Sequence, residues 1–219
     1  MKAYQLLITL NNVKPAVWRR VIIPAETHFK RLHDTIQFAM GWQDYHLYEF
    51  EIDYGYRDCK LQIVGFDETY EEHLFMQQQY LMDPPVEEGD VSCMERIMRI
   101  EMRKARATRL PKYLETYPEF RYLYDYGDDW EHSVKVEKVI EDYPFGHPTL
   151  LEGEGACPPE DVGGSSGYEE FLEAWNNPSH PEHEQMYEWG KSQRYRELDI
   201  PRINKVMESI LKLKKVMSQ

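Results

Sequence analysis

The chain has 219 residues, of which 42% are hydrophobic, enough to build a buried core in one large domain or two small ones. Acidic residues outnumber basic ones 39 to 26, and the net charge of −13 excludes a uniformly basic nucleic-acid-binding coat. The sequence has no apolar run of about 18 residues, no signal-peptide pattern and no CxxC pair among its three cysteines. We therefore expect a globular, cytoplasmic protein with reduced thiols and no membrane contact.

The first fifty residues predict a hairpin, a helix and a further strand. Residues 4–10 and 17–23 are rich in β-branched and aromatic side chains, and an Asn-Asn pair and a proline between them supply turn chemistry. Apolar residues at helical spacing in 29–40, followed by Gly41, predict a helix that packs on this hairpin. Alternation in 46–52 predicts another strand.

A basic segment interrupts the acidic chain. Residues 51–100 hold 12 acidic and 4 basic side chains, whereas 96–112 hold seven basic and one acidic, a balance of +6. The spacing of four arginines predicts an amphipathic helix with a basic stripe made of Arg96, Arg99, Arg103 and Arg106. We interpret this stripe as a solvated face; the alternative is a local surface for nucleic-acid phosphates or an acidic partner.

The second half predicts another hairpin and then helices. Alternating side chains in 120–126 and 130–137 flank a turn at 127–129. The glycine- and proline-rich segment 141–167 is expected to be irregular.

Three helices are expected beyond it. Capping-box patterns at Ser166 and Ser179 predict that two helices begin there, and apolar periodicity predicts a final helix over 203–213.

The densest group of chemically active side chains lies in residues 124–132. Carboxylates and an imidazole can together hold a divalent cation, although the spacing does not match an EF-hand loop. The alternative is a tight acidic turn in which the histidine is a hydrogen-bonded core residue. The candidates are Asp125, Asp128 and Asp129 as metal ligands, His132 as a base, and Tyr124, Tyr126 and Trp130 as binding residues.

Two further motifs carry candidate ligands. The glycine-rich loop 156–168 is not a P-loop, and it contributes Glu160 and Asp161. His180 and His183 stand three residues apart and could ligate a metal from one helix face or simply cap that helix, but HExxH is absent and zinc-protease chemistry is unsupported.

The order of these motifs resembles the plasmid pRi ORF-3-like family, whose members are also described as TnpR-like passenger proteins of insertion elements. The resemblance rests on PAVWRR at 15–20, LHDTIQ at 32–37, MGW at 40–42, HLYEF at 46–50, YDYGDDWEH at 124–132, CPPEDVGG at 157–164 and HPEH at 180–183. It implies a single α+β domain over residues 1–219. The sequence departs from the family pattern around 69–119, where we expect an insertion.

Together these observations predict one α+β domain with a mostly antiparallel sheet flanked by helices, in which the motifs meet in one acidic, aromatic-lined pocket. The favoured function is a mobile-element-associated binding module for a protein or peptide, in preference to nucleic acid. The alternative is a divalent-metal-dependent hydrolase that acts on phosphoesters, with a divalent metal as the cofactor.

Overall fold

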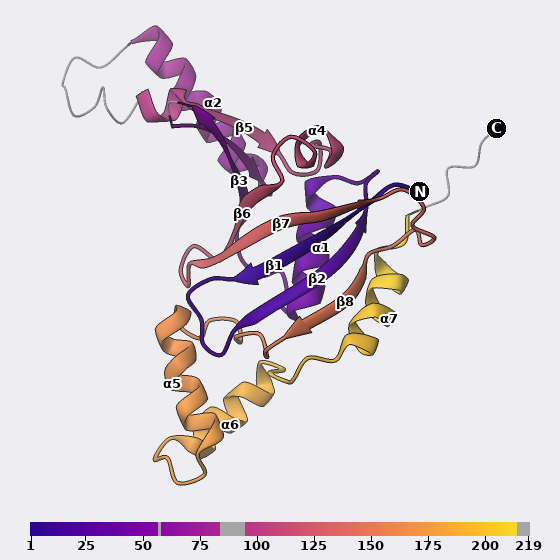
Figure 1. Cartoon of the computed structure of the whole chain (residues 1–219). Coiled ribbons are helices and arrows are strands. Elements are labelled where there is room, and N and C mark those ends of the chain that lie inside the picture. The colour runs from indigo at the N-terminus through magenta and orange to yellow at the C-terminus, as the bar shows by residue number, and fades with distance from the viewer. Residues whose placement is uncertain (57, 84–94, 214–219) are drawn as a thin grey trace.

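One large β-sheet flanked by helices forms the fold (Figure 1). The computed structural model describes residues 1–56, 58–83 and 95–213. Within these ranges the sheet has eight strands in the order β5-β4-β3-β6-β7-β1-β2-β8. Their bounds are β1 (Ala3–Leu10), β2 (Val17–Pro24), β3 (Tyr48–Tyr56), β4 (Cys59–Val64), β5 (Ile100–Lys104), β6 (Glu119–Tyr124), β7 (Trp130–Ile140) and β8 (Thr149–Glu154). Strands β4 and β5 pair in parallel, and the other pairings between these strands are antiparallel. The predicted α+β fold with a mostly antiparallel sheet is confirmed.

Strands β1 and β2 form the predicted N-terminal hairpin. Their register runs from Ala3 opposite Pro24 to Leu10 opposite Val17. Along β1, every second side chain is buried, while the residues between them stay partly exposed. This alternation follows from the period of two in an extended chain, and it gives the sheet one apolar and one polar face.

Helix α1 (Phe29–Met40) covers the apolar face, behind the strands in Figure 1. Its apolar residues recur at three- and four-residue spacing, and Phe29, Leu32 and Ile36 are fully buried. Gly41 ends the helix in the left-handed region at φ 104°, which glycine adopts without steric cost. Helix α7 (Ile200–Ile210) contacts both α1 and β8 and completes this layer.

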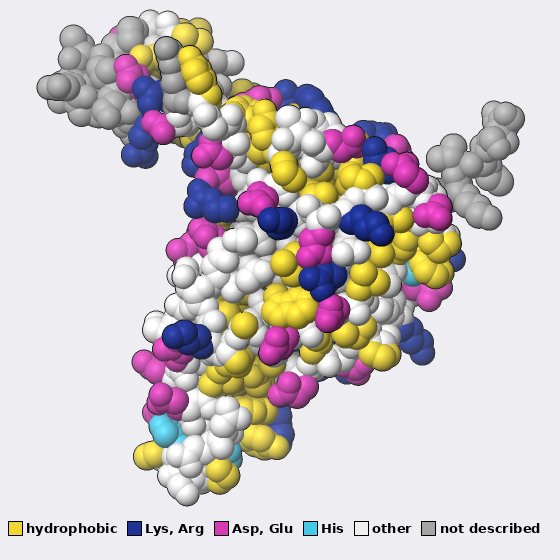
Figure 2. All heavy atoms as spheres, in the orientation of Figure 1, with side chains coloured by type: hydrophobic (Ala, Val, Ile, Leu, Met, Phe, Trp, Pro, Cys, Tyr) yellow, Lys and Arg dark blue, Asp and Glu magenta, His cyan; other side chains and the backbone are white. Residues whose placement is uncertain are grey.

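The opposite face of the sheet carries charged side chains of both signs. On the part of it that the structure describes, Lys, Arg, Asp and Glu side chains lie among exposed hydrophobic ones (Figure 2). Arg20, for example, pairs with both Glu137 and Glu152. The acidic excess of the chain is therefore partly neutralised locally on this face.

The predicted basic helix over 96–112 is wrong. Arg103 lies in β5 opposite Ile63 of β4, and Arg106 lies in the turn that follows. Hydrogen bonds to a neighbouring strand outweigh the helical spacing of the arginines, since propensity and periodicity give way to tertiary pairing. Arg96, Arg99, Arg103 and Arg106 consequently share no helical stripe.

The segment 141–167 contains more regular structure than its composition predicts. Strand β8 lies within it and pairs with β2. This pairing is close at Gly153, where an added Cβ would lie 2.8 Å from the carbonyl oxygen of Trp18.

The helix starts also differ from the capping-box predictions. Helix α5 (Gly164–Asn176) begins two residues before Ser166, and α6 (His183–Ser192) begins four residues after Ser179; neither has a side-chain cap. Glycine geometry and loop packing set these starts.

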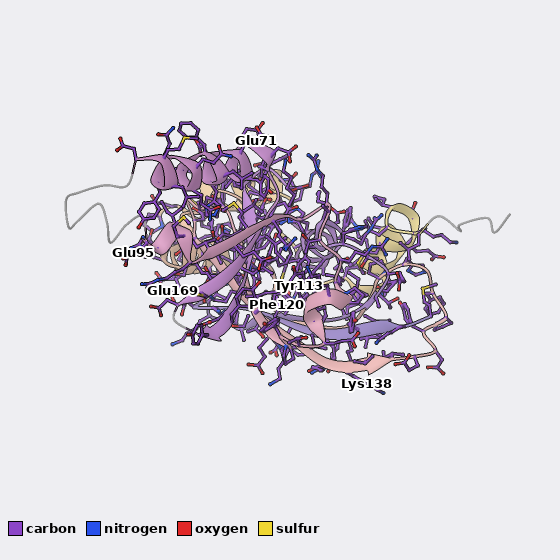
Figure 3. The ribbon with its side chains drawn as sticks, turned by 90° about the horizontal axis from the view of Figure 1, so that it is seen from above. Glu71, Glu95, Tyr113, Phe120, Lys138 and Glu169 are labelled. Atoms are coloured by element: carbon purple, nitrogen blue, oxygen red, sulfur yellow. The ribbon has the colours of Figure 1, made fainter. Side chains whose placement is uncertain are left out.

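Helix α2 (Asp67–Met82) packs against β4 and β5 at one edge of the sheet, and the short α4 (Pro111–Leu114) precedes β6. Glu71 on α2 and Lys138 on β7 project on opposite sides of the molecule, while Tyr113 and Phe120 lie between them (Figure 3) and both contact Phe29. Helices α2 and α4 and strand β5 lie mostly within the segment 69–119, of which residues 84–94 are outside the described ranges. That this segment is an insertion stays a prediction. Among the described residues, no helix combines the length and apolar composition that a membrane crossing requires.

Candidate metal centre

Three loops meet where strands β3 and β6 pair. The β3–β6 register places Tyr48 opposite Tyr124, and the backbone N–H of Asp125 donates to the carbonyl oxygen of Leu47. This pairing brings His46, in the loop before β3, beside Asp125, in the turn after β6. The loop between β8 and α5 adds Glu160 and Asp161. The two central motifs of the sequence thus converge with a histidine that sequence reasoning did not select as a ligand.

Three carboxylates surround one ring nitrogen of His46. Its Nε2 lies 3.5 Å from Oδ2 of Asp125, 3.7 Å from Oε2 of Glu160 and 3.4 Å from Oδ1 of Asp161. These separations exceed hydrogen-bond length, and Nε2 is buried without a hydrogen-bond partner. Ligand atoms of His46, Asp125 and Asp161 all lie within 4.8 Å of one another.

Asp125 is fixed by its own backbone turn. The residue is buried and has φ 58°, a left-handed conformation that aspartate tolerates. Its Oδ1 accepts hydrogen bonds from the N–H groups of Gly127 at 2.9 Å and Asp128 at 3.4 Å. The other carboxylate oxygen, Oδ2, therefore remains available to the centre.

Glu160 is the most deeply buried carboxylate of the group, with 2% of its surface exposed. Its Oε1 accepts hydrogen bonds from the Gln43 N–H at 2.7 Å and from the Tyr124 hydroxyl at 3.0 Å. Burial raises the pKa of this carboxyl above its ordinary value, although both hydrogen bonds act in the opposite direction. Glu160 is thus a stronger base than an exposed glutamate.

Asp161 lies on the solvent side of the centre, with a side chain that is 68% exposed and a φ of 56°. No Lys or Arg in the described part of the chain forms an ion pair with Asp125, Glu160 or Asp161. The cluster therefore concentrates negative charge that no cationic side chain of its own neutralises.

Asp128 and Asp129, also candidate ligands, lie outside this group. Asp128 joins two loops, since its Oδ2 accepts a hydrogen bond from the Gly163 N–H and its carbonyl oxygen would lie 2.9 Å from a side chain at Gly164. Asp129 closes the turn through its N–H, which donates to the carbonyl oxygen of Asp125. Both residues shape the loops that carry the ligands.

His180 and His183 also lie apart from the centre, at the start of α6. The ring of His180 accepts a hydrogen bond from the Glu182 N–H, while the Nδ1 of His183 lies 2.8 Å from the carbonyl oxygen of Ala174. They serve the junction of α5 and α6 and do not join the carboxylates.

His132 is wholly buried on β7 and does not face the centre's carboxylates. Its Nδ1 lies 3.1 Å from the Trp130 carbonyl oxygen and 3.2 Å from that of Tyr122, so Nδ1 carries the hydrogen and donates. Burial lowers its pKa to about 4. A group that stays neutral and has no access to solvent fits the core role better than that of a base.

Some of the candidate binding residues are buried and others are exposed. Trp130 and Tyr124 are buried, and Tyr124 supports Glu160, whereas Tyr126 is 48% exposed and donates to Glu49. The arginines of the basic segment are mostly engaged by acidic neighbours, with Arg99 paired to Asp58 and Glu95, Arg103 to Glu101 and Arg106 to Asp67.

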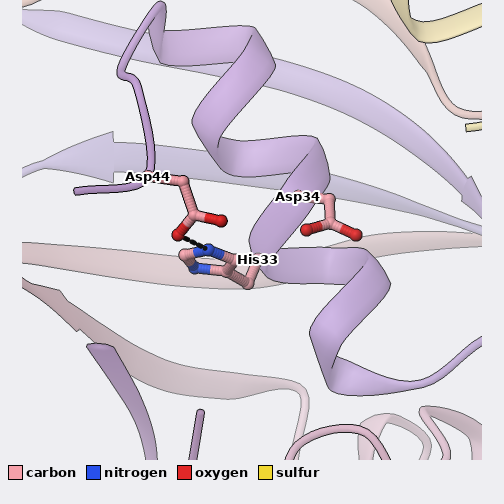
Figure 4. Close-up of side chains that lie close together, drawn as sticks. All are labelled: His33, Asp34 and Asp44. Carbon is pink, nitrogen blue, oxygen red and sulfur yellow. Dashed lines mark hydrogen bonds and ion pairs between the residues drawn. The ribbon is translucent and has the colours of Figure 1, made fainter. Parts of the chain in front are cut away.

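A second group of similar composition comprises His33, Asp34 and Asp44 (Figure 4). Both ring nitrogens of His33 have hydrogen-bond partners, the Tyr122 hydroxyl at 2.8 Å and Asp44 at 2.7 Å. The Lys30 ammonium lies 2.6 Å from Asp34 and 3.3 Å from Asp44. A lysine already provides the positive charge here, so this group is a closed polar network.

Three comparisons with known proteins agree with this architecture. The family model described as "Plasmid pRiA4b ORF-3-like protein" matches residues 2–204. The chain is 38% identical over 191 residues to the uncharacterized protein y4hQ of Sinorhizobium fredii (strain NBRC 101917 / NGR234), covering 87% of this chain and 82% of that protein. It is also similar to the crystal structure of the protein of unknown function MM3350 from Methanosarcina mazei Go1, with a TM-score of 0.65, 28% identity and coverage of 86% of this chain and 89% of that one.

Proposed function

This chain belongs to the plasmid pRiA4b ORF-3-like family, and we propose that it is a divalent-metal-binding protein with its ion on His46, Asp125 and Asp161. The observation that carries the proposal is the buried Nε2 of His46, which has no hydrogen-bond partner although three carboxylates surround it at 3.4–3.7 Å. Association with mobile elements and a cytoplasmic location are further parts of the proposal, and both rest on the sequence alone.

The spacing of the donors supports a metal ion. Two ligands that each lie about 2.1 Å from one tetrahedral ion are roughly 3.4 Å apart, close to the separations around His46. One imidazole with carboxylate oxygens favours a transition ion such as Zn²⁺ or Mn²⁺ over Ca²⁺, which prefers oxygen ligands alone. The absence of a competing Lys or Arg ion pair at these carboxylates, within the described ranges, acts in the same direction.

We extend the proposal to a hydrolase that acts on phosphoesters. The exposed Asp161 leaves one side of the centre open to a substrate and to water. The buried Glu160, with its raised pKa, stands within reach to accept a proton from that water. A bound divalent ion would supply Lewis-acid activation of the water and of the phosphoryl oxygen.

Metal titration by calorimetry, with elemental analysis of the purified protein, tests metal binding. We expect one equivalent of Zn²⁺ to bind the wild type, and His46→Gln and Asp125→Asn to weaken binding at least about 100-fold, since each removes a ligand. Asp34→Asn is the matched control from the lysine-paired group, and the double variant His180→Gln/His183→Gln controls for the other histidines. Equal affinities across all these variants would refute the site.

Hydrolysis is tested separately with bis(p-nitrophenyl) phosphate and p-nitrophenyl phosphate in the presence of the ion that binds. We expect Glu160→Gln to retain the metal and lose at least about 100-fold of the rate, the usual contribution of a general base. If Glu160→Gln keeps the full rate, Glu160 is not the general base. The titration tests metal binding independently of this result.

A groove beside Asp161 favours the binding module as a second candidate function. A cavity of about 400 Å³ lies between α5 and α6. Its floor is apolar and comprises Val162, Phe171, Met186 and Trp189, and its rim is acidic and comprises Asp161, Glu170 and Glu182. This lining suits an apolar peptide side chain flanked by lysines or arginines. Fluorescence anisotropy with a labelled Leu/Lys peptide tests it, and we expect Glu170→Lys/Glu182→Lys to abolish binding, whereas Glu169→Lys/Glu173→Lys, the control pair on α5, leaves it intact. Binding that survives the rim variant would exclude this groove.

A further inference from the structure

A separate pocket of about 240 Å³ lies between the end of α1, the segment that joins α6 to α7, and α7 itself. Its apolar wall comprises Phe38, Met40, Trp42, Leu198, Ile203 and Val206. Its charged lining comprises four arginines and two acids: Arg19, Arg194, Arg196, Arg202, Glu197 and Asp199. Four cations and two anions give a local formal charge of +2 in a chain whose net charge is −13.

Three of these arginines have no ionic partner within the described chain. The guanidinium groups of Arg194, Arg196 and Arg202 form neither a hydrogen bond nor an ion pair with any described residue. Of the eight described arginines outside the pocket, six pair with a carboxylate: Arg20, Arg99, Arg103, Arg106, Arg109 and Arg121. Arg31 and Arg96 are the other two, and they are far apart in the sequence. A protein with 39 acidic residues therefore leaves three neighbouring guanidinium groups unpaired at one pocket.

Arg196 lies close enough to Arg194 and Arg202 for their charges to repel, although all three residues are exposed. Partial burial lowers the pKa of Arg196, and the charges of Arg202 and Arg194 lower it further. The charge of Asp199 acts in the opposite direction but less strongly than either arginine. An anion placed among the three guanidinium groups would remove the repulsion and form charge-assisted hydrogen bonds.

A buried cation also lines the pocket. Arg19 is 1% exposed, and four of its five N–H groups donate to carbonyl oxygens, those of Trp18, Ala39, Glu154 and Gly155. None of these partners is a carboxylate, so the charge of Arg19 is solvated but not neutralised. The remaining N–H belongs to Nη2 and has no partner among the described residues.

We propose that this pocket binds a small organic anion, a carboxylate or phosphate on an apolar body. The anionic group would lie among Arg194, Arg196 and Arg202, and the apolar body would lie against Phe38 and Val206. The cavity is smaller than the roughly 300–1,000 Å³ of pockets for drug-sized ligands, which favours a compact ligand. Its wall includes Gln43, whose N–H donates to Glu160, so the pocket adjoins the candidate metal centre without sharing its ligands.

Binding is tested by calorimetry with four probes on protein that has been stripped of metal with EDTA and then dialysed free of it, because EDTA is itself a polycarboxylate that would compete for the arginines. Phenyl phosphate and benzoate carry both the charge and the apolar body; inorganic phosphate lacks the body, and benzyl alcohol lacks the charge. We expect the first two to bind at least about tenfold more tightly than the last two, with affinity falling as salt rises. If inorganic phosphate or benzyl alcohol binds equally well, the proposal is wrong.

Two variants locate the site. Arg194→Gln/Arg196→Gln/Arg202→Gln should weaken phenyl phosphate binding at least about tenfold through the lost charge-assisted hydrogen bonds. Arg99→Gln/Arg103→Gln/Arg106→Gln removes the same charge elsewhere and should change affinity by less than about twofold. Val206→Phe keeps all the arginines but fills the cavity, and it should also weaken binding. Equal effects of the two triple variants, or full affinity in Val206→Phe, would overturn the assignment.

Discussion

Lowering the pH from 7 to 4 is expected to destabilise the protein through His132. Burial lowers its folded-state pKa to about 4, from an ordinary value near 6.5. Above pH 6.5 neither the folded nor the unfolded chain protonates this ring. Between 6.5 and 4 only the unfolded chain binds the proton, so the free energy of unfolding falls as the pH falls.

The expected loss follows from the width of that window. A difference of about 2.5 pH units at about 1.36 kcal/mol per unit gives roughly 3 kcal/mol, complete near pH 4. The cause is structural: protonation would add a second N–H at Nε2, which is buried without a partner.

Urea unfolding at several pH values measures this contribution as a difference between variants. His132→Phe keeps a ring of similar shape and lacks the titrating group, so its free energy of unfolding should decline less steeply between pH 6.5 and 4 than that of the wild type. Ser133→Ala, on the exposed side of the same strand, should retain the wild-type slope. Identical slopes for wild type and His132→Phe would show that His132 does not stay neutral in the folded state.

Two further substitutions test other parts of the structure. Gly167→Ala should destabilise the protein by about 2–3 kcal/mol in urea unfolding, because the added Cβ would lie 2.0 Å from the Val162 carbonyl oxygen. Gly146→Ala is the control and should be nearly neutral, since the atom nearest to its added Cβ is 4.0 Å away. Tyr124→Phe should keep the Zn²⁺ affinity but lower the rate of phosphoester hydrolysis about tenfold, because it removes the hydroxyl that orients Glu160. Tyr126→Phe, whose hydroxyl donates to Glu49, should leave both the affinity and the rate unchanged. A destabilised Gly146→Ala, or a Tyr124→Phe variant with the full rate of hydrolysis, would contradict these assignments.

Local periodicity predicts the elements whose environment is set by nearby sequence. The β1–β2 hairpin and helix α1 follow from alternating and helical spacing because one face of each packs on the core. Composition does not predict the conformation of a segment that becomes a strand by pairing with another strand. Strand β5 exists because β4 offers it a hydrogen-bonding edge, and β8 exists because β2 does, and neither edge is visible in the segment's own residues.

The candidate centre was predictable in part for the same reason. Asp125, Glu160 and Asp161 come from motifs that the sequence marks as rich in carboxylates, but His46 is 79 residues from Asp125 and joins it through the β3–β6 register. A single sequence carries no signal for that pairing beyond the alternation that predicts a strand near residue 46. His180 and His183 satisfy a local spacing rule and still lie elsewhere, since the fold of α5 and α6 directs them to Ala174 and Glu182.

Residue composition alone also fails to separate the two histidine–carboxylate groups, and the difference between them lies in charge compensation. Around His33, the Lys30 ammonium bridges Asp34 and Asp44, and both ring nitrogens are hydrogen-bonded, so an added cation would have to displace a lysine that is already in place. Around His46, the carboxylates have no lysine or arginine partner in the described chain, and the buried ring nitrogen has no hydrogen bond. Close carboxylates repel one another, so an arrangement of this kind is stable only if a cation or protons neutralise it. A divalent ion between His46, Asp125 and Asp161 would supply that positive charge and leave Glu160 free to accept a proton.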